Sequence, residues 1–259
     1  MPLSQESLDA VLGLRPFRFF PQIDSTNDHA RAWLLEGAPA GAVVIADEQT
    51  TGRGRFQRTW NAPPGTAILM SVILRPEVAP SKLGRATMVG AVSVAEALAT
   101  VPSLPMEMIG LKYPNDVLLV GRKVAGILAE AVWEGDRLVG VVLGIGLNVR
   151  IDFTGTALAT AATSIERVTG VSIHRTDLAD RLLKRVDHWA ARIGERSLFN
   201  AWRGRLTTLG QRVSVRLSGD DTWAIQGLAQ DVDEEGALIV RDDSGADHRI
   251  IAGDVTLQS

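Results

Sequence analysis

Residues 117–143 read VLLVGRKVAGILAEAVWEGDRLVGVVL, and their pattern is the strongest indication of the architecture. Three apolar runs, at 117–120, 124–131 and 138–143, are separated by Gly121-Arg122 and Gly135-Asp136. Short glycine-containing turns between β-prone runs are typical of β-hairpins. The stretch therefore predicts three neighbouring strands in an antiparallel meander.

Further elements extend this meander into a sheet covered by helices. β-Branched and apolar runs predict strands at 17–23, 42–46 and 67–74. Helical spacing predicts helices at 25–37, 81–101, 176–193 and 198–206. Ser25 is the expected N-cap of the first helix, and the second helix is apolar on most of its sides. We therefore expect an α+β fold with a mixed, largely antiparallel sheet.

The sequence pattern changes after Gly210 from long apolar segments to short strands separated by turns. Val213, Val215 and Leu217 alternate with polar residues, and short strands around Trp223, 238–240 and 250–251 follow between the turn sequences SGDD, DEEG and DDSG. Short strands at close, regular intervals are typical of small barrels. We predict a large domain at 1–206 and a small barrel of about five strands at 207–259.

Composition narrows the classes of function. The chain has 259 residues, 46% of them hydrophobic, with a net charge of −3, which argues against binding polyanions through bulk positive charge. It has no cysteine, which excludes disulfides, thiolate metal sites and cysteine nucleophiles. The first 20 residues lack signal-peptide features, and no apolar run reaches about 18 residues. We therefore expect a cytoplasmic protein without a membrane partner.

A concentrated basic segment, TGRGRFQRTW, occupies residues 51–60 between two predicted strands. Its glycines let the backbone approach an anion, and the guanidinium groups of Arg53, Arg55 and Arg58 can grip phosphate or carboxylate oxygens. A basic loop that is simply exposed to solvent, without a ligand, would have the same sequence. No Gly-Lys-Ser/Thr follows and no helix comes after it, so it is neither a Walker loop nor a dinucleotide fingerprint.

Three other segments offer candidate ligand groups. LKYPND at 111–116 supplies a lysine and hard oxygen donors suited to Mg²⁺, although turn chemistry explains it equally. Lys123 starts a strand in which Gly126 leaves room for a ligand against the backbone. GIGLN at 144–148 ends a strand with two glycines and an amide, a pattern that a strand-end bulge also produces. The four histidines show no metal spacing.

Taken in order, five motifs resemble those of the biotin protein ligases. They are SerThrAsn at 25–27, Gln49 followed by GRGR at 52–55 with Arg58 and Trp60, KYPND at 112–116, GRKVAGIL at 121–128, and GIGLN at 144–148. The resemblance covers about residues 17–206, and the remainder resembles that family's SH3-like barrel. It implies a catalytic domain of the class II synthetase type followed by this barrel.

The resemblance implies a two-step reaction. Biotin is activated by ATP to biotinyl-5′-AMP with release of pyrophosphate, and biotin then passes to a lysine of a carboxyl-carrier protein of acetyl-CoA carboxylase or a related biotin-dependent enzyme. ATP and Mg²⁺ are the implied co-substrate and metal, with no tightly bound prosthetic group. Whether the chain forms a homodimer stays open.

The resemblance also implies roles for individual residues. The expected catalytic cations are Lys123, Arg55, Arg58 and Lys112. The expected biotin contacts are Ser25, Thr26, Asn27, Gln49, Gly52, Arg53, Lys123, Gly126 and Leu128. The expected ATP and adenylate contacts are Arg55, Arg58, Trp60, Lys112, Asn115, Leu147 and Asn148, with Asp116 at Mg²⁺.

The chain departs from the family pattern in two places. Phe56-Gln57 replaces the usual x-Gly of the arginine loop, so the turn after Arg55 is expected to differ, and Tyr113 stands where tryptophan is commoner. Only 23 residues precede Asp24, too few for the N-terminal DNA-binding domain of the bifunctional members. We therefore expect the monofunctional form, without DNA binding.

Two alternatives belong to other specificities or classes. A lipoate or octanoate ligase has a related fold, but its Arg-Arg-x-x-Gly-Gly-Gly-x-x-x-His-Asp pattern is missing here. A non-catalytic binder of biotin or nucleic acid would use the same arginine loop without chemistry. The net charge and the lack of aromatics interleaved with the basic residues argue against the nucleic-acid version.

Overall fold

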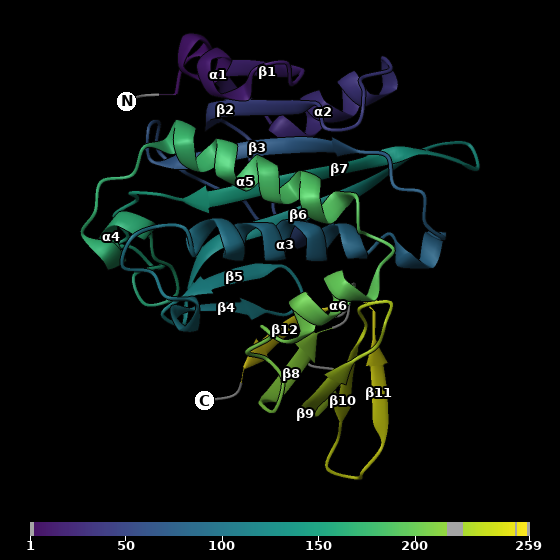
Figure 1. Cartoon of the computed structure of the whole chain (residues 1–259). Coiled ribbons are helices and arrows are strands. Elements are labelled where there is room, and N and C mark those ends of the chain that lie inside the picture. Colours follow the sequence, from purple (N-terminus) through teal and green to yellow (C-terminus); the bar gives the residue numbers. More distant parts are fainter. Residues whose placement is uncertain (1–2, 217–224, 252, 258–259) are drawn as a thin grey trace.

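The computed structural model describes residues 3–216, 225–251 and 253–257, which form two β-sheets and the helices that pack on the larger one (Figure 1). The larger sheet has seven strands in the order β1-β2-β3-β7-β6-β5-β4. Its strands are β1 (Phe17–Ile23), β2 (Val43–Gln49), β3 (Ala67–Leu74), β4 (Ile109–Lys112), β5 (Asp116–Leu119), β6 (Arg122–Glu134) and β7 (Arg137–Asn148).

Pairing in the large sheet is antiparallel except between β1 and β2, which run parallel. The predicted meander is confirmed as β5, β6 and β7, and the mixed, largely antiparallel fold class is confirmed with it. Sequence reasoning missed β4, whose four residues include Gly110, and placed the start of β2 at Ala42 rather than Val43.

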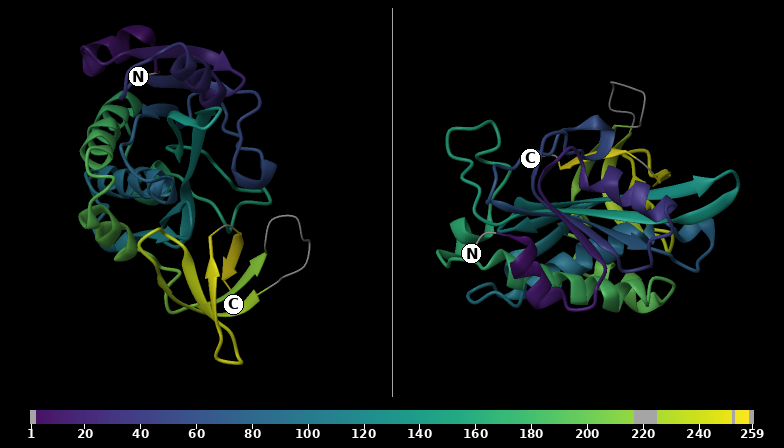
Figure 2. Two further views of the ribbon diagram at one scale, coloured as in Figure 1. Left: turned by 90° about the vertical axis from the view of Figure 1, so that its right-hand side faces the viewer. Right: turned by 90° about the horizontal axis from the view of Figure 1, so that it is seen from above.

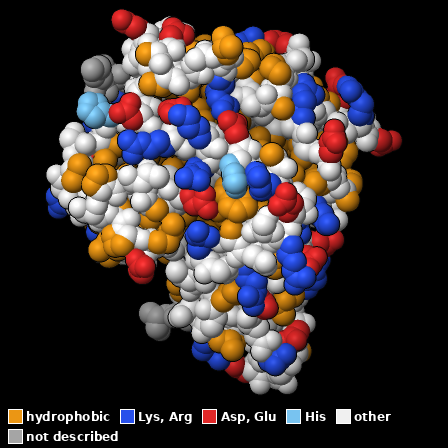
Figure 3. All heavy atoms as spheres, viewed as in Figure 1, with side chains coloured by type: hydrophobic (Ala, Val, Ile, Leu, Met, Phe, Trp, Pro, Cys, Tyr) orange, Lys and Arg blue, Asp and Glu red, His pale blue; other side chains and the backbone are white. Residues whose placement is uncertain are grey.

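Helices lie on both faces of the sheet. The helical elements are α1 (Gln5–Leu12), α2 (Thr26–Leu35), α3 (Arg85–Leu98), α4 (Ile165–Thr169), α5 (Arg175–Ala190) and α6 (Arg196–Arg203), with 3₁₀ turns η1 (Arg55–Gln57), η2 (Pro80–Lys82) and η3 (Met106–Met108). Helices α3 and α5 cover one face, and the loop that follows β2 lies on the other (Figure 2). On the face shown in Figure 3, acidic and basic side chains are interspersed.

Two-residue alternation assigns each strand position to a face. In β7, Leu143, Ile145 and Leu147 belong to the main core beneath α3 and α5. The residues between them, Gly144 and Gly146, face the opposite side. Burial of the first set contributes to the hydrophobic driving force for folding, and it leaves the second set facing the side where a ligand can bind.

The N-terminus of α2 corrects one prediction. Ser25 stands at the N-cap position, but its side chain makes no capping hydrogen bond. Gln49 accepts instead from the first helical N–H, that of Thr26, over 2.7 Å. A side chain from β2 therefore takes over the capping role that the sequence pattern assigned to Ser25.

The smaller sheet begins after α6 and has five antiparallel strands in the order β11-β10-β9-β8-β12. They are β8 (Arg212–Arg216), β9 (Ile225–Val232), β10 (Leu238–Arg241), β11 (Asp247–Ile250) and β12 (Asp254–Leu257). The predicted SH3-like class of this part is confirmed. Leu217, the predicted turn at 218–221 and Trp223 lie outside the described residues.

Buried polar groups join the two sheets. Arg85, at the start of α3, is only 2% exposed and donates to the carbonyls of Glu234 in the β9–β10 turn and of Ile193, Gly194 and Glu195 before α6. Tyr113 donates through its hydroxyl to the Ile250 carbonyl over 3.0 Å, and burial raises the pKa of this phenol. The small sheet is therefore anchored through groups that water cannot reach.

No helix within the described ranges is both long enough and apolar enough to cross a membrane.

The β5–β6 turn generates a stability prediction. Val120 and Gly121 both have positive φ, 51° and 72°, and Val120 is 53% exposed. A β-branched residue is strained in this left-handed region, whereas asparagine adopts it readily. We expect Val120→Asn to raise the free energy of unfolding by about 1 kcal/mol, measured by urea denaturation. Val120→Ala should give a smaller gain, and a lower midpoint for Val120→Asn would contradict the turn geometry.

Candidate active site

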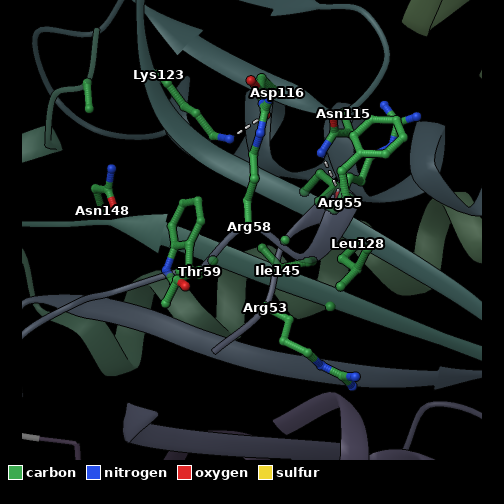
Figure 4. A pocket seen from close by; sticks show the side chains of 18 of the residues that line it. Arg53, Arg55, Arg58, Thr59, Asn115, Asp116, Lys123, Leu128, Ile145 and Asn148 are labelled. Carbon is green, nitrogen blue, oxygen red and sulfur yellow. Dashed lines mark hydrogen bonds and ion pairs between the residues drawn. The ribbon is translucent and has the colours of Figure 1, made fainter. Parts of the chain in front are cut away.

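A cavity of about 350 Å³ opens on the sheet face opposite α3 and α5 (Figure 4). Its walls come from the α2 N-terminus, the 52–60 loop, the β4–β5 turn, β6 and β7. The residues predicted from sequence that line it are Ser25, Thr26, Asn27, Gln49, Arg53, Arg55, Arg58, Trp60, Lys112, Asn115, Asp116, Lys123, Gly126, Leu128 and Asn148. Segments far apart in the chain thus converge on one site.

Two predicted residues lie outside the lining. The Leu147 side chain is fully buried in the core beneath the helices, because strand alternation directs it away from its neighbours Gly146 and Asn148. Gly52 lies behind the loop, where its carbonyl accepts from the Trp60 N–H over 2.8 Å. A Cβ at Gly52 would meet the Trp60 carbonyl oxygen at 2.5 Å, so close backbone packing explains this glycine.

A β-bulge directs Lys123 into the cavity. The pairing of β5 with β6 shifts register between Val117/Ala125 and Leu118/Lys123, which leaves Val124 as the extra residue. Without the bulge, Lys123 and Gly126 would face opposite sides of the sheet. With the bulge, the Lys123 Nζ lies within 3.3 Å of the position of a Cβ on Gly126.

One end of the cavity is lined by neutral polar groups. Gln49 Oε1 accepts from the Thr26 hydroxyl over 2.9 Å, and Ser71 Oγ lies 2.8 Å from Thr26 Oγ1 and 2.6 Å from Asn27 Oδ1. The Asn27 amide donates to Glu130 Oε2 over 2.5 Å. Both polar atoms of Asn27 therefore have partners within the protein, and its amide ties α2 to strands β3 and β6.

The Trp60 indole lies across the middle of the cavity floor. A Cβ on Gly126 would come within 2.8 Å of the ring, and a Cβ on Gly146 within 2.5 Å. The room that the sequence predicted above Gly126 is thus taken by this ring. Trp60 Nε1 is buried without a hydrogen-bond partner, and Lys123 Nζ lies 5.4 Å from the ring centroid. An unpaired buried donor is suited to a ligand acceptor.

The arginine loop closes on itself as a small hairpin. The Gly54 N–H donates to the Arg58 carbonyl over 2.7 Å, and the backbones of Arg53 and Thr59 form an antiparallel β-bridge. Between them, η1 places Phe56 in the left-handed region at φ 55° and ψ 39°. Phe56 thus holds a backbone conformation that glycine adopts more readily, and the centroid of its ring lies 4.9 Å from the Arg55 guanidinium carbon.

The cations of the cavity are paired with acceptors of the protein itself. Lys123 Nζ lies 2.6 Å from Asp116 Oδ1, and Figure 4 shows the two side chains pointing toward each other. Arg58 pairs with Asp254, and Arg53 pairs with Asp28 on α2. Each of these three cations therefore has a carboxylate of the protein beside it.

Arg55 is the most enclosed of the loop cations. Its Nη2 donates to the Gly253 carbonyl over 3.3 Å. Burial lowers the pKa of Arg55, and the charges of Tyr113, Asp254 and Asp116 oppose that shift. The guanidinium stays protonated at neutral pH, so a partly desolvated positive charge faces the cavity.

The two asparagines named from sequence also hold backbone. Asn115 donates to the Ile127 carbonyl over 3.0 Å, and Asn148 donates to the Thr163 carbonyl over 3.1 Å. Their amide nitrogens therefore fix the strands, and their carbonyl oxygens are the atoms left for a ligand.

A metal would find few protein ligands here. Among the described residues no group of three or more His, Cys, Asp or Glu side chains is arranged to hold an ion. Asp116 Oδ1 is nevertheless buried without a hydrogen bond in spite of its ion pair. One carboxylate beside an amide oxygen fits Mg²⁺ held mainly by substrate phosphates.

Sequence reasoning missed two walls of the cavity. One is the 151–163 segment, which supplies Phe153, Leu158, Ala161 and Ala162 and is tied down where the Lys123 N–H donates to the Ala161 carbonyl over 2.9 Å. Apolar residues in an otherwise small and polar segment were its only signal. The other is β12 with Asp254 and Val255, which depends on how the two sheets pack and left no signal in the sequence.

Comparisons with known proteins agree on one family. Residues 19–148 match the Biotin/lipoate A/B protein ligase family, and residues 208–257 match the Biotin protein ligase C terminal domain. The chain is 35% identical to the biotin–[acetyl-CoA-carboxylase] ligase of Mycobacterium tuberculosis, over 98% of this chain and 95% of that protein. It is 32% identical to the bifunctional ligase/repressor BirA of Bacillus spizizenii, over 91% and 72%.

Among solved structures, the biotin protein ligase from Aquifex aeolicus in complex with biotin and ATP is similar with a TM-score of 0.77. The sequences are 27% identical, and the match covers 95% of this chain and 99% of that chain.

The packing of Trp60 on glycine generates a prediction. A methyl group at position 146 would lie 2.5 Å from the indole, so Gly146→Ala should expel the ring toward solvent and lower the free energy of unfolding by about 1 kcal/mol. The difference between the fluorescence spectra of a protein and of its Trp60→Phe variant isolates the emission of Trp60. In Gly146→Ala this emission should shift to longer wavelength than in the wild type. Gly194→Ala is the control, because its Cβ meets only Val78 at 3.6 Å. An unshifted Trp60 spectrum would contradict the packing.

Proposed function

Because the chain belongs to the Biotin/lipoate A/B protein ligase family, we propose that it attaches biotin to a carrier protein in two steps. A biotin carboxylate oxygen attacks the α-phosphorus of ATP, a new P–O bond forms, and pyrophosphate leaves. A lysine amine of the carrier then attacks the acyl carbon of biotinyl-5′-AMP, and AMP leaves.

The observation that carries this proposal is the division of one cavity into a neutral polar end and a cationic end. Thr26 and Gln49 lie at the first, and Arg55, Arg58 and Lys123 lie at the second. A neutral ureido ring with an anionic tail needs both ends at once. An octanoyl chain has no polar group for the first end, which favours biotin over a fatty acid.

At the neutral end, Ser25, Thr26 and Gln49 would hydrogen-bond the ureido group, with the Arg53 backbone nearby. Asn27 would act through its bonds to Ser71 and Glu130, which fix the helix start. Each ureido group left unpaired in a buried site would cost about 1–3 kcal/mol. Gly126 and Leu128 would line the valeryl tail.

At the cationic end, electrostatic stabilisation would lower the barrier. Two anions, a carboxylate and a phosphate, must meet, and fixed positive charges offset their repulsion. Lys123 would lie between them, Arg55 and Arg58 would hold the phosphates, and Lys112 would assist. Bound Mg²⁺ would neutralise further phosphate charge, held by Asp116 with the Asn115 oxygen.

The adenylate would occupy the side of the cavity near Trp60 and Asn148. The mixed anhydride is sensitive to water, so the arginine loop would shield it until the carrier arrives.

We divide the chain into a catalytic domain at 1–206 and a small barrel at 207–259. ATP as co-substrate and a chain without cysteine both suit the cytoplasm.

The experiment that tests this function is a pyrophosphate-release assay with the intact chain. ATP and biotin together should release pyrophosphate and form biotinyl-5′-AMP, and a carboxyl-carrier domain should then gain the mass of one biotin. Octanoate in place of biotin should give no turnover. Turnover with octanoate alone would assign the chain to the other branch of its family.

Lys123 generates a prediction about the first step. Lys123→Gln leaves a polar side chain one atom shorter and removes the charge between the reacting anions, so biotinyl-5′-AMP formation should fall about 10²–10³-fold. Quenched-flow measurement with radiolabelled ATP reports this step. Lys184→Gln on α5 removes an exposed lysine elsewhere and should leave the rate unchanged. Adenylation at the normal rate in Lys123→Gln would disprove the role of Lys123.

Arg55 generates a prediction about retention of the intermediate. Arg55→Gly removes one charge-assisted grip on phosphate, so adenylation should persist while biotinyl-5′-AMP dissociates roughly tenfold faster or more. A filter-binding chase with unlabelled intermediate gives the dissociation rate. Arg55→Lys keeps the charge but not the two-pronged guanidinium group, so its dissociation rate should lie between those of the wild type and Arg55→Gly. An unchanged dissociation rate in Arg55→Gly would count against this assignment.

A further inference from the structure

Strand β12 of the small sheet and the residue before it supply two acceptors to the arginine loop of the large domain. Asp254 forms an ion pair with Arg58, and the adjacent Gly253 carbonyl accepts from Arg55. Asp254 and Val255 also line the cavity. The C-terminal sheet thus contacts the two arginines that would hold phosphate.

This ion pair contributes little to stability. The Arg58 side chain is 63% exposed and the Asp254 side chain 26% exposed, and partly exposed ion pairs are weak because water screens them. The loop is already closed by its own hydrogen bonds between Gly54 and Arg58. Stability therefore does not explain a carboxylate at this position.

A carboxylate on the wall of a phosphate site opposes ligand binding in two ways. It occupies the guanidinium that the phosphate needs, and its negative charge repels the phosphate oxygens. Lys123 is paired in the same way with Asp116, so each of these two cations already has an anion of the protein beside it. Asp254 differs from Asp116 in coming from the other domain.

We propose that Asp254 is a positioning residue that holds Arg58 against the small sheet while the phosphate site is empty, and releases it to an incoming polyphosphate. The exchange replaces one weak ion pair with a stronger, charge-assisted contact, so it proceeds when a polyphosphate is present. Identification of that polyphosphate as ATP rests on the proposed function.

The exchange links the placement of the small sheet to the state of the loop. With Arg58 on Asp254 and Arg55 on Gly253, the loop is tethered to the start of β12 and to the residue before it. When polyphosphate takes the guanidinium groups, both tethers are lost, and the loop is free to settle on the ligand. The small sheet thereby sets how readily the loop leaves its resting position.

Asp254→Asn tests the exchange, because it removes the charge with little change in shape. Without ligand, trypsin should cleave the intact variant after Arg55 and Arg58 several-fold faster than the wild type, as followed by mass spectrometry. Its affinity for inorganic pyrophosphate, measured by calorimetry, should rise about two- to fivefold. The KM for ATP should fall by a similar factor while kcat stays unchanged.

Two further variants sharpen the test. Asp254→Glu keeps the charge and should restore slow cleavage and the wild-type KM. Asp243→Asn removes a carboxylate that pairs with Arg212 in the same sheet, away from the cavity, and should match the wild type in every measurement.

Unchanged cleavage of the loop in Asp254→Asn, or unchanged pyrophosphate affinity, would overturn the proposal. So would a rise in the KM for ATP, which would make Asp254 a ligand of the nucleotide or its metal. The cleavage and pyrophosphate measurements need no biotin. A chain that forms no biotinyl-5′-AMP but shows both effects would retain the exchange and refute only the proposed function.

Discussion

The register of β6 against β7 is the constraint on which the rest of the structure depends. It places Gly126 opposite Gly146, and Leu128 opposite Gly144, on the cavity face, with Ile127 opposite Ile145 in the core. A slip of one residue would turn the glycines into the core and the isoleucines into the cavity. The same pairing supports the Trp60 ring, and on the other edge of β6 the bulge at Val124 in the pairing with β5 brings Lys123 to the cavity. The cavity floor and the hydrophobic core are therefore two faces of one strand pair, and neither can change alone.

Charge compensation decides how cations from separate segments coexist in this cavity. Lys123, Arg55 and Arg58 would repel one another if they were unpaired, and each instead has an acceptor on Asp116, Gly253 or Asp254. These partners cost little to displace where they are exposed to water. The protein thus assembles a positive site before any ligand arrives, and a negatively charged ligand finds the donors already gathered.

Sequence patterns predicted what depends on local periodicity and composition. The meander and the buried helix that became α3 follow from neighbouring residues, whereas the convergence of basic and glycine-rich motifs on one cavity was implied by the family resemblance. Strand alternation, counted from Gly146, would also have directed Leu147 to the core. Features that depend on tertiary packing could not be predicted in this way. The bulge at Val124, the Gln49 bond that replaces Ser25 as a cap, and Asp254 at the cavity wall each require a partner from a distant segment.

Arg85 limits how this protein can be rearranged in evolution. Its guanidinium cannot lose its charge, and it sits in the interior with acceptors drawn from both the helical layer and the β9–β10 turn. A gene fusion or truncation that discarded the C-terminal sheet would remove the Glu234 carbonyl, which accepts two of the hydrogen bonds of this buried cation, at a cost of several kcal/mol. An exchanged sheet from a relative would have to present a carbonyl where Glu234 presents one. Although the two parts look modular, the buried contacts of Arg85 make them structurally interdependent.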